Sequence, residues 1–138
     1  LKVRGPGPIG TTSHTTYCDR YYIAVPQHTP QAFVPRCDFI SAVGWGEGGA
    51  DGRSKLGLPG GGPRLCLTPL CVFDFGGADK RLRLQSIHPG RTVAEVEAAT
   101  GCEIEVPAEV PTTDPPGVEE LRVLREVIDP NRLLAEGI

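Results

Sequence analysis

One apolar run limits the fold of this chain more than any other feature of its sequence. Residues 65–75 read Leu-Cys-Leu-Thr-Pro-Leu-Cys-Val-Phe-Asp-Phe, and glycines at 60–62 and 76–77 bound them. A continuous apolar run of this length is typical of strand segments covered on both faces, as in a layered α/β sheet. Pro69 lacks a backbone donor and therefore breaks the run. We expect buried strands before and after it.

Further short β segments are predicted where β-branched, aromatic or alternating residues recur. They lie at 21–25, 33–34, 39–40, 81–85 and 103–106. The first has the composition of a buried strand. Residues 81–85 alternate strictly between polar residues and leucine, which indicates a strand with one wet face. We expect this strand to form a hairpin with the apolar run, turning at 76–79.

Two helices are predicted in the last third of the chain. Thr92 and Glu95 fit a capping box, which predicts a helix over 93–100 with Gly101 as its left-handed stop. Apolar residues recur at helical spacing over 121–128, and Pro130 closes that pattern. Two helices cover a sheet incompletely, so we expect the remaining cover to come from further sequence or from a partner.

Composition narrows the class of protein. The 138 residues suit a single domain, 1–138, and the net charge of −3 with dispersed basic residues argues against a nucleic-acid partner. Five cysteines form no C-x-x-C pair, which favours a reducing cytoplasm over a disulfide framework. We expect no membrane span, since no apolar run approaches about 18 residues. The chain begins at Leu1 and contains no Met, so we expect it to be a piece of a longer sequence.

The first candidate site is a segment rich in glycine and hydroxyl groups. It contains Gly5, Gly7, Gly10, Thr11 and Thr12. Glycines allow backbone amides to converge on an anionic oxygen, and threonine hydroxyls add donors. From the residues alone a plain surface turn is the better interpretation, because the two interspersed prolines remove donors and no phosphate-binding motif is matched.

The second candidate site is the glycine-rich segment 44–63, which holds Trp45 and Glu47. A loop this long is functional or disordered. Glu47 is either a reachable carboxylate or, as we favour, a solvated one. The histidines His14, His28 and His88 match no metal-ligand spacing. A triad composed from Ser13, Cys18, His28 and Asp38 lacks any nucleophile-elbow sequence.

The ordered succession of Phe73-Asp74-Phe75, His88-Pro89-Gly90 and Thr100-Gly101 resembles the C-terminal part of family I CoA-transferase β subunits. Val110-Pro111-Thr112-Thr113 and Ile128-Asp129-Pro130 continue the likeness. Within this family the chain resembles the group of glutaconate CoA-transferase β subunits, which includes hydrolase subunits that open a CoA-linked steroid ring. The resemblance runs over essentially the whole chain.

This resemblance implies an α/β fold with an open, largely parallel sheet and flanking helices, here as an incomplete subunit. It implies an α-type partner subunit in a hetero-oligomer, acyl-CoA and carboxylate substrates, and no permanently bound cofactor. A glutamate outside this chain would attack the thioester. The resemblance also makes Gly5, Gly7, Gly10, Thr11 and Thr12 a wall of the coenzyme A site, which reverses the interpretation from the residues alone.

Four functions remain open. The leading one is CoA transfer between carboxylic acids. A hydrolase or decarboxylase subunit of the same family is the first alternative. A non-catalytic subunit that completes a partner's sheet is the second. A free-standing small-molecule binding domain is the poorest, because the missing start argues against it.

Overall fold

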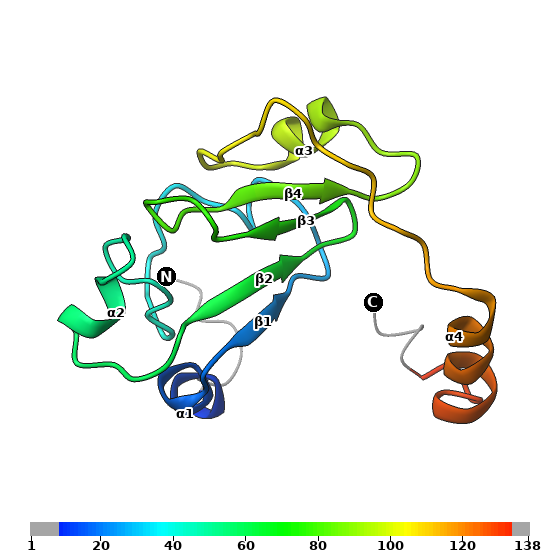
Figure 1. Cartoon of the computed structure of the whole chain (residues 1–138), viewed down its shortest axis with the longest axis horizontal. Coiled ribbons are helices and arrows are strands. Elements are labelled where there is room, and N and C mark those ends of the chain that lie inside the picture. The colour runs from blue at the N-terminus through cyan, green and yellow to red at the C-terminus, as the bar shows by residue number, and fades with distance from the viewer. Residues whose placement is uncertain (1–8, 134–138) are drawn as a thin grey trace.

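A four-stranded sheet in the order β1-β2-β3-β4 forms the centre of the molecule (Figure 1). The computed structural model describes residues 9–133. Its strands are β1 (Tyr21–Ala24), β2 (Pro63–Leu67), β3 (Cys71–Asp74) and β4 (Arg83–Ile87). Its helices are α1 (Ile9–Tyr17), α2 (Gly52–Lys55), α3 (Val93–Ala99), α4 (Val118–Val123) and the π-helix η1 (Leu124–Ile128). The expected α/β class is confirmed.

The sheet is mixed, which corrects the expectation of a largely parallel one. β1 runs parallel to β2, whereas β2 with β3 and β3 with β4 are antiparallel. The physical reason lies in the connections, because a parallel crossover needs a dozen or more residues. Only residues 68–70 join β2 to β3, and the Cys71 amide closes this turn by donating to Thr68 Oγ1 at 3.1 Å. The predicted hairpin between β3 and β4 is confirmed.

The two edges of the sheet differ. The segment that follows α3 runs beside β4 through isolated parallel bridges, with the Leu84 amide donating to the Glu105 carbonyl at 2.9 Å. The strand predicted at 103–106 is therefore reduced to a bridge. β1 lies at the opposite edge, and its Tyr22 and Ile23 are exposed. The expectation of a buried strand at 21–25 is wrong, because neighbouring strand residues point to opposite faces and the described residues leave the side chains of both Tyr22 and Ile23 exposed.

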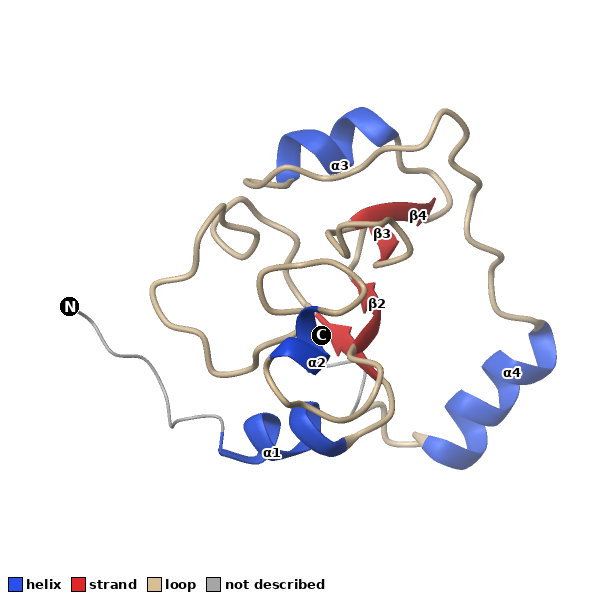
Figure 2. Ribbon diagram, turned by 60° about the vertical axis from the view of Figure 1, so that its left-hand side comes forward, coloured by secondary structure: helices blue, strands red, loops and turns tan. Residues whose placement is uncertain are grey.

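The core lies between the central strands and α3, which Figure 2 shows beside β3 and β4. Phe73 of β3, Leu84 of β4 and Val96 of α3 are fully buried in one cluster. Phe33 joins this cluster from a segment without strand structure, so the extended piece predicted at 33–34 is wrong in conformation. The piece at 39–40 is also not a strand, and both of its side chains are exposed.

The helix α3 begins at the predicted capping box. Thr92 Oγ1 accepts from the Glu95 amide at 3.2 Å, and the Glu95 carboxylate accepts from the Thr92 amide at 2.7 Å. Gly101, however, is not the left-handed stop, because its backbone is not in that region. A Cβ there would lie 2.5 Å from the Phe33 carbonyl and 2.6 Å from that of Pro30. The glycine allows two backbones to approach closely.

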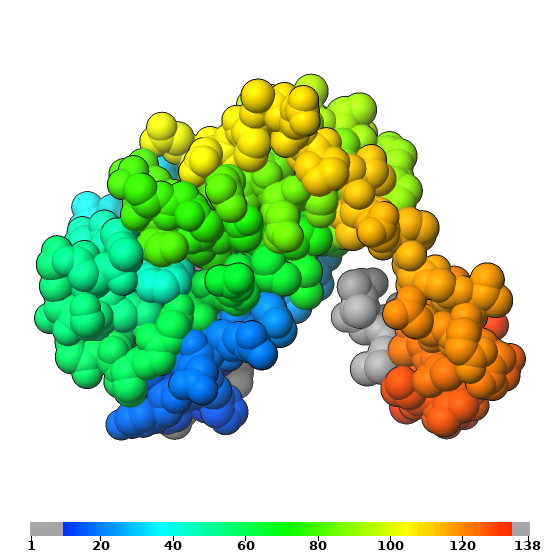
Figure 3. Space-filling model, viewed as in Figure 1, coloured from blue at the N-terminus to red at the C-terminus, as the bar shows by residue number. Residues whose placement is uncertain are grey.

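The helical pattern predicted over 121–128 is confirmed as α4 continued by η1, which stands apart from the sheet (Figures 1 and 3). Arg122 joins Glu119 at 2.7 Å and Glu126 at 3.3 Å on its solvated face. Within residues 9–133, no helix is long and apolar enough to cross a membrane.

Candidate functional site

The first candidate segment is helical where it is described. Gly5 and Gly7 lie outside the described residues, and Gly10, Thr11 and Thr12 belong to the first turns of α1. The expected glycine turn is therefore wrong for these three residues. Further along the helix, threonine hydroxyls donate hydrogen bonds to carbonyls of the same helix, as Thr15 Oγ1 does to the Thr11 carbonyl at 2.8 Å. The surface at the start of α1 is open, since a Cβ at Gly10 would meet nothing within 4 Å.

The second candidate segment, 44–63, is organised by Arg53, which sequence reasoning missed. Its side chain is buried, with 2% of the residue exposed, and its guanidinium donates only to backbone carbonyls. Nη1 reaches Gly44 at 2.8 Å, and Nη2 reaches Thr15 and Pro59 at 2.9 Å. The same cation thereby ties both ends of the loop to the last turn of α1, whose carbonyls carry partial negative charge.

Trp45 is fixed inside this loop. Its Nε1 donates to the Pro63 carbonyl at 3.2 Å, and its ring lies so close to Gly62 that a Cβ there would come within 3.2 Å of it. Lys80 Nζ lies 5.2 Å from the ring centroid, within the range of a cation–π contact. The backbone of Lys80 is left-handed, with φ of 55°, which is unusual for a residue other than glycine. Glu47 is exposed.

Next to Trp45 lies a hollow of about 220 Å³ at the end of the sheet nearer α2 (Figure 1). Trp45, Arg64, Asp74, Lys80 and Arg83 all line it. Arg83 holds Asp74 through two parallel hydrogen bonds of 2.9 Å, Nε to Oδ1 and Nη2 to Oδ2. Burial by itself would raise the pKa of Asp74, but the hydrogen bonds from Arg83 and from a backbone amide keep this pKa below its ordinary value. The carboxylate is therefore ionised near neutral pH.

Two of the three histidines meet at Thr68, at the opposite end of the sheet. His28 Nδ1 lies 2.9 Å from Thr68 Oγ1, and its Nε2 lies 2.9 Å from Thr100 Oγ1. Thr100 gives its own proton to the Val96 carbonyl at 2.6 Å, so His28 Nε2 must be the donor in their bond. Burial lowers the pKa of His28, in keeping with a neutral ring. His88 Nε2 donates to the Thr68 carbonyl at 2.9 Å.

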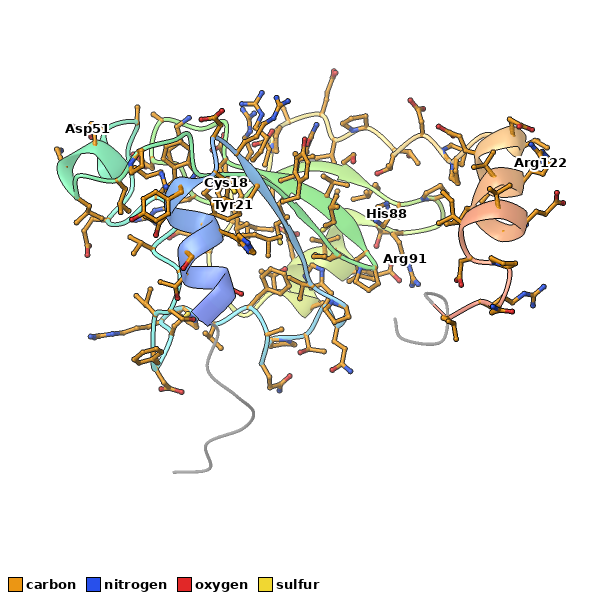
Figure 4. The ribbon with its side chains drawn as sticks, turned by 90° about the horizontal axis from the view of Figure 1, so that it is seen from below. Cys18, Tyr21, Asp51, His88, Arg91 and Arg122 are labelled. Atoms are coloured by element: carbon orange, nitrogen blue, oxygen red, sulfur yellow. The ribbon has the colours of Figure 1, made fainter. Side chains whose placement is uncertain are left out.

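These contacts exclude the composed triad. Both nitrogens of His28 are occupied by threonine hydroxyls, whereas Ser13, Cys18 and Asp38 are exposed. Figure 4 shows Cys18 on the side of the molecule near Tyr21, far from His88. Among residues 9–133, no three His, Cys, Asp or Glu side chains gather where they could hold a metal ion.

The cysteines are all free. Burial, with a smaller contribution from Cys71, raises the pKa of the Cys66 thiol to about 11, and burial also raises that of Cys71. A thiol of this kind behaves as a small apolar side chain rather than as a nucleophile.

Comparison with known proteins gives consistent relatives. The chain is 37% identical over 124 residues to the B subunit of 3-oxoadipate CoA-transferase from Pseudomonas knackmussii, covering 90% of this chain and 47% of that protein. It is 36% identical over 131 residues to the cholesterol ring-cleaving hydrolase IpdB subunit of Rhodococcus jostii, covering 95% of this chain and 48% of that protein. No family model matches the chain.

A solved structure agrees with these relatives. Glutaconate coenzyme A-transferase from Acidaminococcus fermentans superposes with a TM-score of 0.84 and 29% identity, over 96% of this chain and 50% of that chain. The chain thus spans about half the length of the relatives it matches.

Proposed function

We propose that this chain, a homologue of CoA-transferase B subunits over nearly its whole length, is the C-terminal part of a β-type subunit that moves coenzyme A between carboxylic acids. The observation that carries the proposal is the 37% identity to a CoA-transferase B subunit over 90% of the chain. The TM-score of 0.84 to a glutaconate CoA-transferase supports it. The acyl-CoA thioester is the substrate, and no cofactor is permanently bound.

The covalent step is assigned outside residues 1–138. The resemblance implies that a glutamate of the other half of the subunit attacks the thioester carbonyl, which gives an acyl-glutamyl anhydride and releases the coenzyme A thiolate. The thiolate then attacks the glutamyl carbonyl, which releases the first carboxylic acid and leaves coenzyme A on the glutamate as a thioester. Glu47 of this chain lies on an exposed loop and is given no such role. This chain contributes the sheet, the start of α1 and the ordered loop around Arg53.

An α-type subunit is the proposed partner. Among residues 9–133 no strand pairs with the outer edge of β1, whose Tyr22 and Ile23 are exposed. Edge strands in stable proteins are usually covered or blocked. Five free cysteines favour a reducing compartment, so we assign the protein to the cytoplasm.

We keep Gly5, Gly7, Gly10, Thr11 and Thr12 as the proposed wall of the coenzyme A site. Backbone amides at the start of a helix favour an anionic oxygen, which supports this role for the start of α1. Gly10→Ala tests it, because the new methyl group meets no protein atom. Alanine favours the helix by up to about 1 kcal/mol, so stability should be kept or rise. If the wall lies against substrate, KM for the thioester rises at least several-fold; an unchanged KM contradicts the assignment.

Hydrolysis of a CoA thioester is the second candidate function. The identity of 36% to a ring-cleaving hydrolase subunit is nearly equal to the identity to the transferase subunit. The two are separated by incubating the full protein, assembled with its partner, with an acyl-CoA in the presence and absence of a carboxylate acceptor. Transfer yields a new thioester that depends on the acceptor. Release of free coenzyme A at the same rate without an acceptor supports hydrolysis and contradicts transfer.

A further inference from the structure

The hollow beside Trp45 carries an excess of positive charge. Arg64, Lys80 and Arg83 line it together with one carboxylate, Asp74. The Arg83 guanidinium is committed to Asp74 by two hydrogen bonds of 2.9 Å, so this pair is neutral as a unit. Arg64 and Lys80 have no ion-pair partner among residues 9–133. Asp74 also attracts the Arg64 guanidinium, but three cations against one carboxylate still leave the lining of the hollow with a net charge of +2.

The walls of the hollow are held in place before any ligand arrives. Trp45 is anchored by its bond to the Pro63 carbonyl, and Lys80 lies over its ring. The left-handed backbone of Lys80 is stabilised by the bond from its amide to the Gly77 carbonyl at 3.2 Å. Non-glycine residues in this conformation cluster at functional sites, where the surrounding structure stabilises the strain. A site that is already ordered loses less entropy when it binds.

Size and charge together select the ligand. Pockets that take a whole drug-sized molecule have about 300–1,000 Å³, so a hollow of about 220 Å³ takes only one group of a larger ligand. A phosphate monoester carries a charge of about −1.5 to −2 near neutral pH. This charge matches two cations, whereas a carboxylate would match one. Arginine and lysine are also the side chains most used to bind phosphate oxygens.

We propose that Arg64 and Lys80, beside the Trp45 ring, form a binding site for a phosphate group of the coenzyme A substrate. The identity of the ligand rests on the proposed function, whereas the anion site itself rests on the geometry of the hollow. Coenzyme A offers two sources of this chemistry, its 3′-phosphate and its diphosphate. The site is formed by β2 and the β3–β4 connection.

Isothermal titration calorimetry tests the proposal directly. The full protein, assembled with its partner, is titrated with coenzyme A, dephospho-coenzyme A and inorganic diphosphate. The same titrations follow Arg64→Gln, Lys80→Gln and the double variant. Arg91→Gln is the matched control, because Arg91 is exposed and lies next to His88 at the other end of β4 (Figure 4). Circular dichroism checks that each variant is folded.

We expect each single substitution to weaken coenzyme A binding by about tenfold and the double variant by more, with Arg91→Gln unchanged. Loss of discrimination between coenzyme A and dephospho-coenzyme A in the variants assigns the 3′-phosphate; equal weakening for both assigns the diphosphate. Equal coenzyme A affinity in wild type and double variant overturns the site. Binding of inorganic diphosphate that depends on Arg64 and Lys80, without binding of coenzyme A, supports the anion site and contradicts the proposed function.

Discussion

Replacing Arg53 by methionine should lower the free energy of unfolding more than a surface substitution does, because the Arg53 guanidinium orders the loop 44–63. The side chain is buried and donates to carbonyls at both ends of the loop and in α1. Methionine has a similar length and fills much of the same space, so the cost of a cavity is small. What the substitution removes is the donors.

The magnitude follows from the carbonyls that lose their partner. Thr15 is buried and Gly44 is half-buried, so water replaces the guanidinium poorly at these two acceptors. A buried acceptor left unsatisfied costs about 1–3 kcal/mol, which gives a total of about 2–6 kcal/mol. We expect about 3 kcal/mol, a large share of the roughly 5–15 kcal/mol that stabilise a typical domain.

Urea unfolding followed by Trp45 fluorescence measures this change, because the indole lies in the same loop. A loss of about 3 kcal/mol lowers the midpoint by about 1–3 M urea at the usual slope. The matched control is Lys55→Met on the same helix, since Lys55 is exposed and pairs only with exposed Asp51 at 2.8 Å. Its midpoint should stay close to that of the wild type. If Arg53→Met also unfolds within about 1 kcal/mol of wild type, the guanidinium does not organise the loop.

Three further predictions concern a close backbone approach, a buried histidine and the exposure of the cysteines. Gly101→Ala should lower the free energy of unfolding in urea by about 1–3 kcal/mol, because the new Cβ would press against two carbonyls. An unchanged free energy of unfolding contradicts the close approach of the two backbones. Burial lowers the pKa of His28 from 6.5, so the contribution of the neutral ring to the free energy of unfolding is fully present above pH 6.5 and is lost as the pH falls toward the folded-state pKa. His28→Gln should therefore flatten the slope of the free energy of unfolding against pH below 6.5. An unchanged slope refutes the assignment. With a thiol reagent at about pH 8, exposed Cys18 and Cys37 should react first, whereas Cys66, whose pKa is about 11, should react only when the chain unfolds. Mass spectrometry maps the labelled residues. Early labelling of Cys66 would be inconsistent with the fold.

The sequence predicts well the features that depend on neighbouring residues. The apolar run 65–75 predicts β2 and β3, and Thr92 with Glu95 predicts the start of α3. Both patterns are local, since a few neighbouring residues are enough to indicate a buried strand or the start of a helix. The exposure of β1 was predicted wrongly because it depends on which distant segments cover the two faces of the strand.

The candidate site was harder to predict, because its chemistry is assembled from distant segments. The glycine-rich composition of 44–63 indicated a loop of interest, and Trp45 does line the hollow. Nothing in the local sequence separates buried Arg53 from a solvated arginine, since its acceptors include carbonyls nearly forty positions away. The pairing of Lys80 with Trp45 likewise depends on the left-handed turn before β4.

The proposed function places this chain in a subunit whose other half carries the attacking carboxylate. The most direct measurement is the mass of the full protein, assembled with its partner, after incubation with an acyl-CoA and rapid acid quench. We expect a thioester-linked coenzyme A adduct that maps to a glutamate outside residues 1–138. An adduct on a residue of this chain, such as Glu47, or turnover of the thioester with no adduct under trapping conditions, would contradict the proposal.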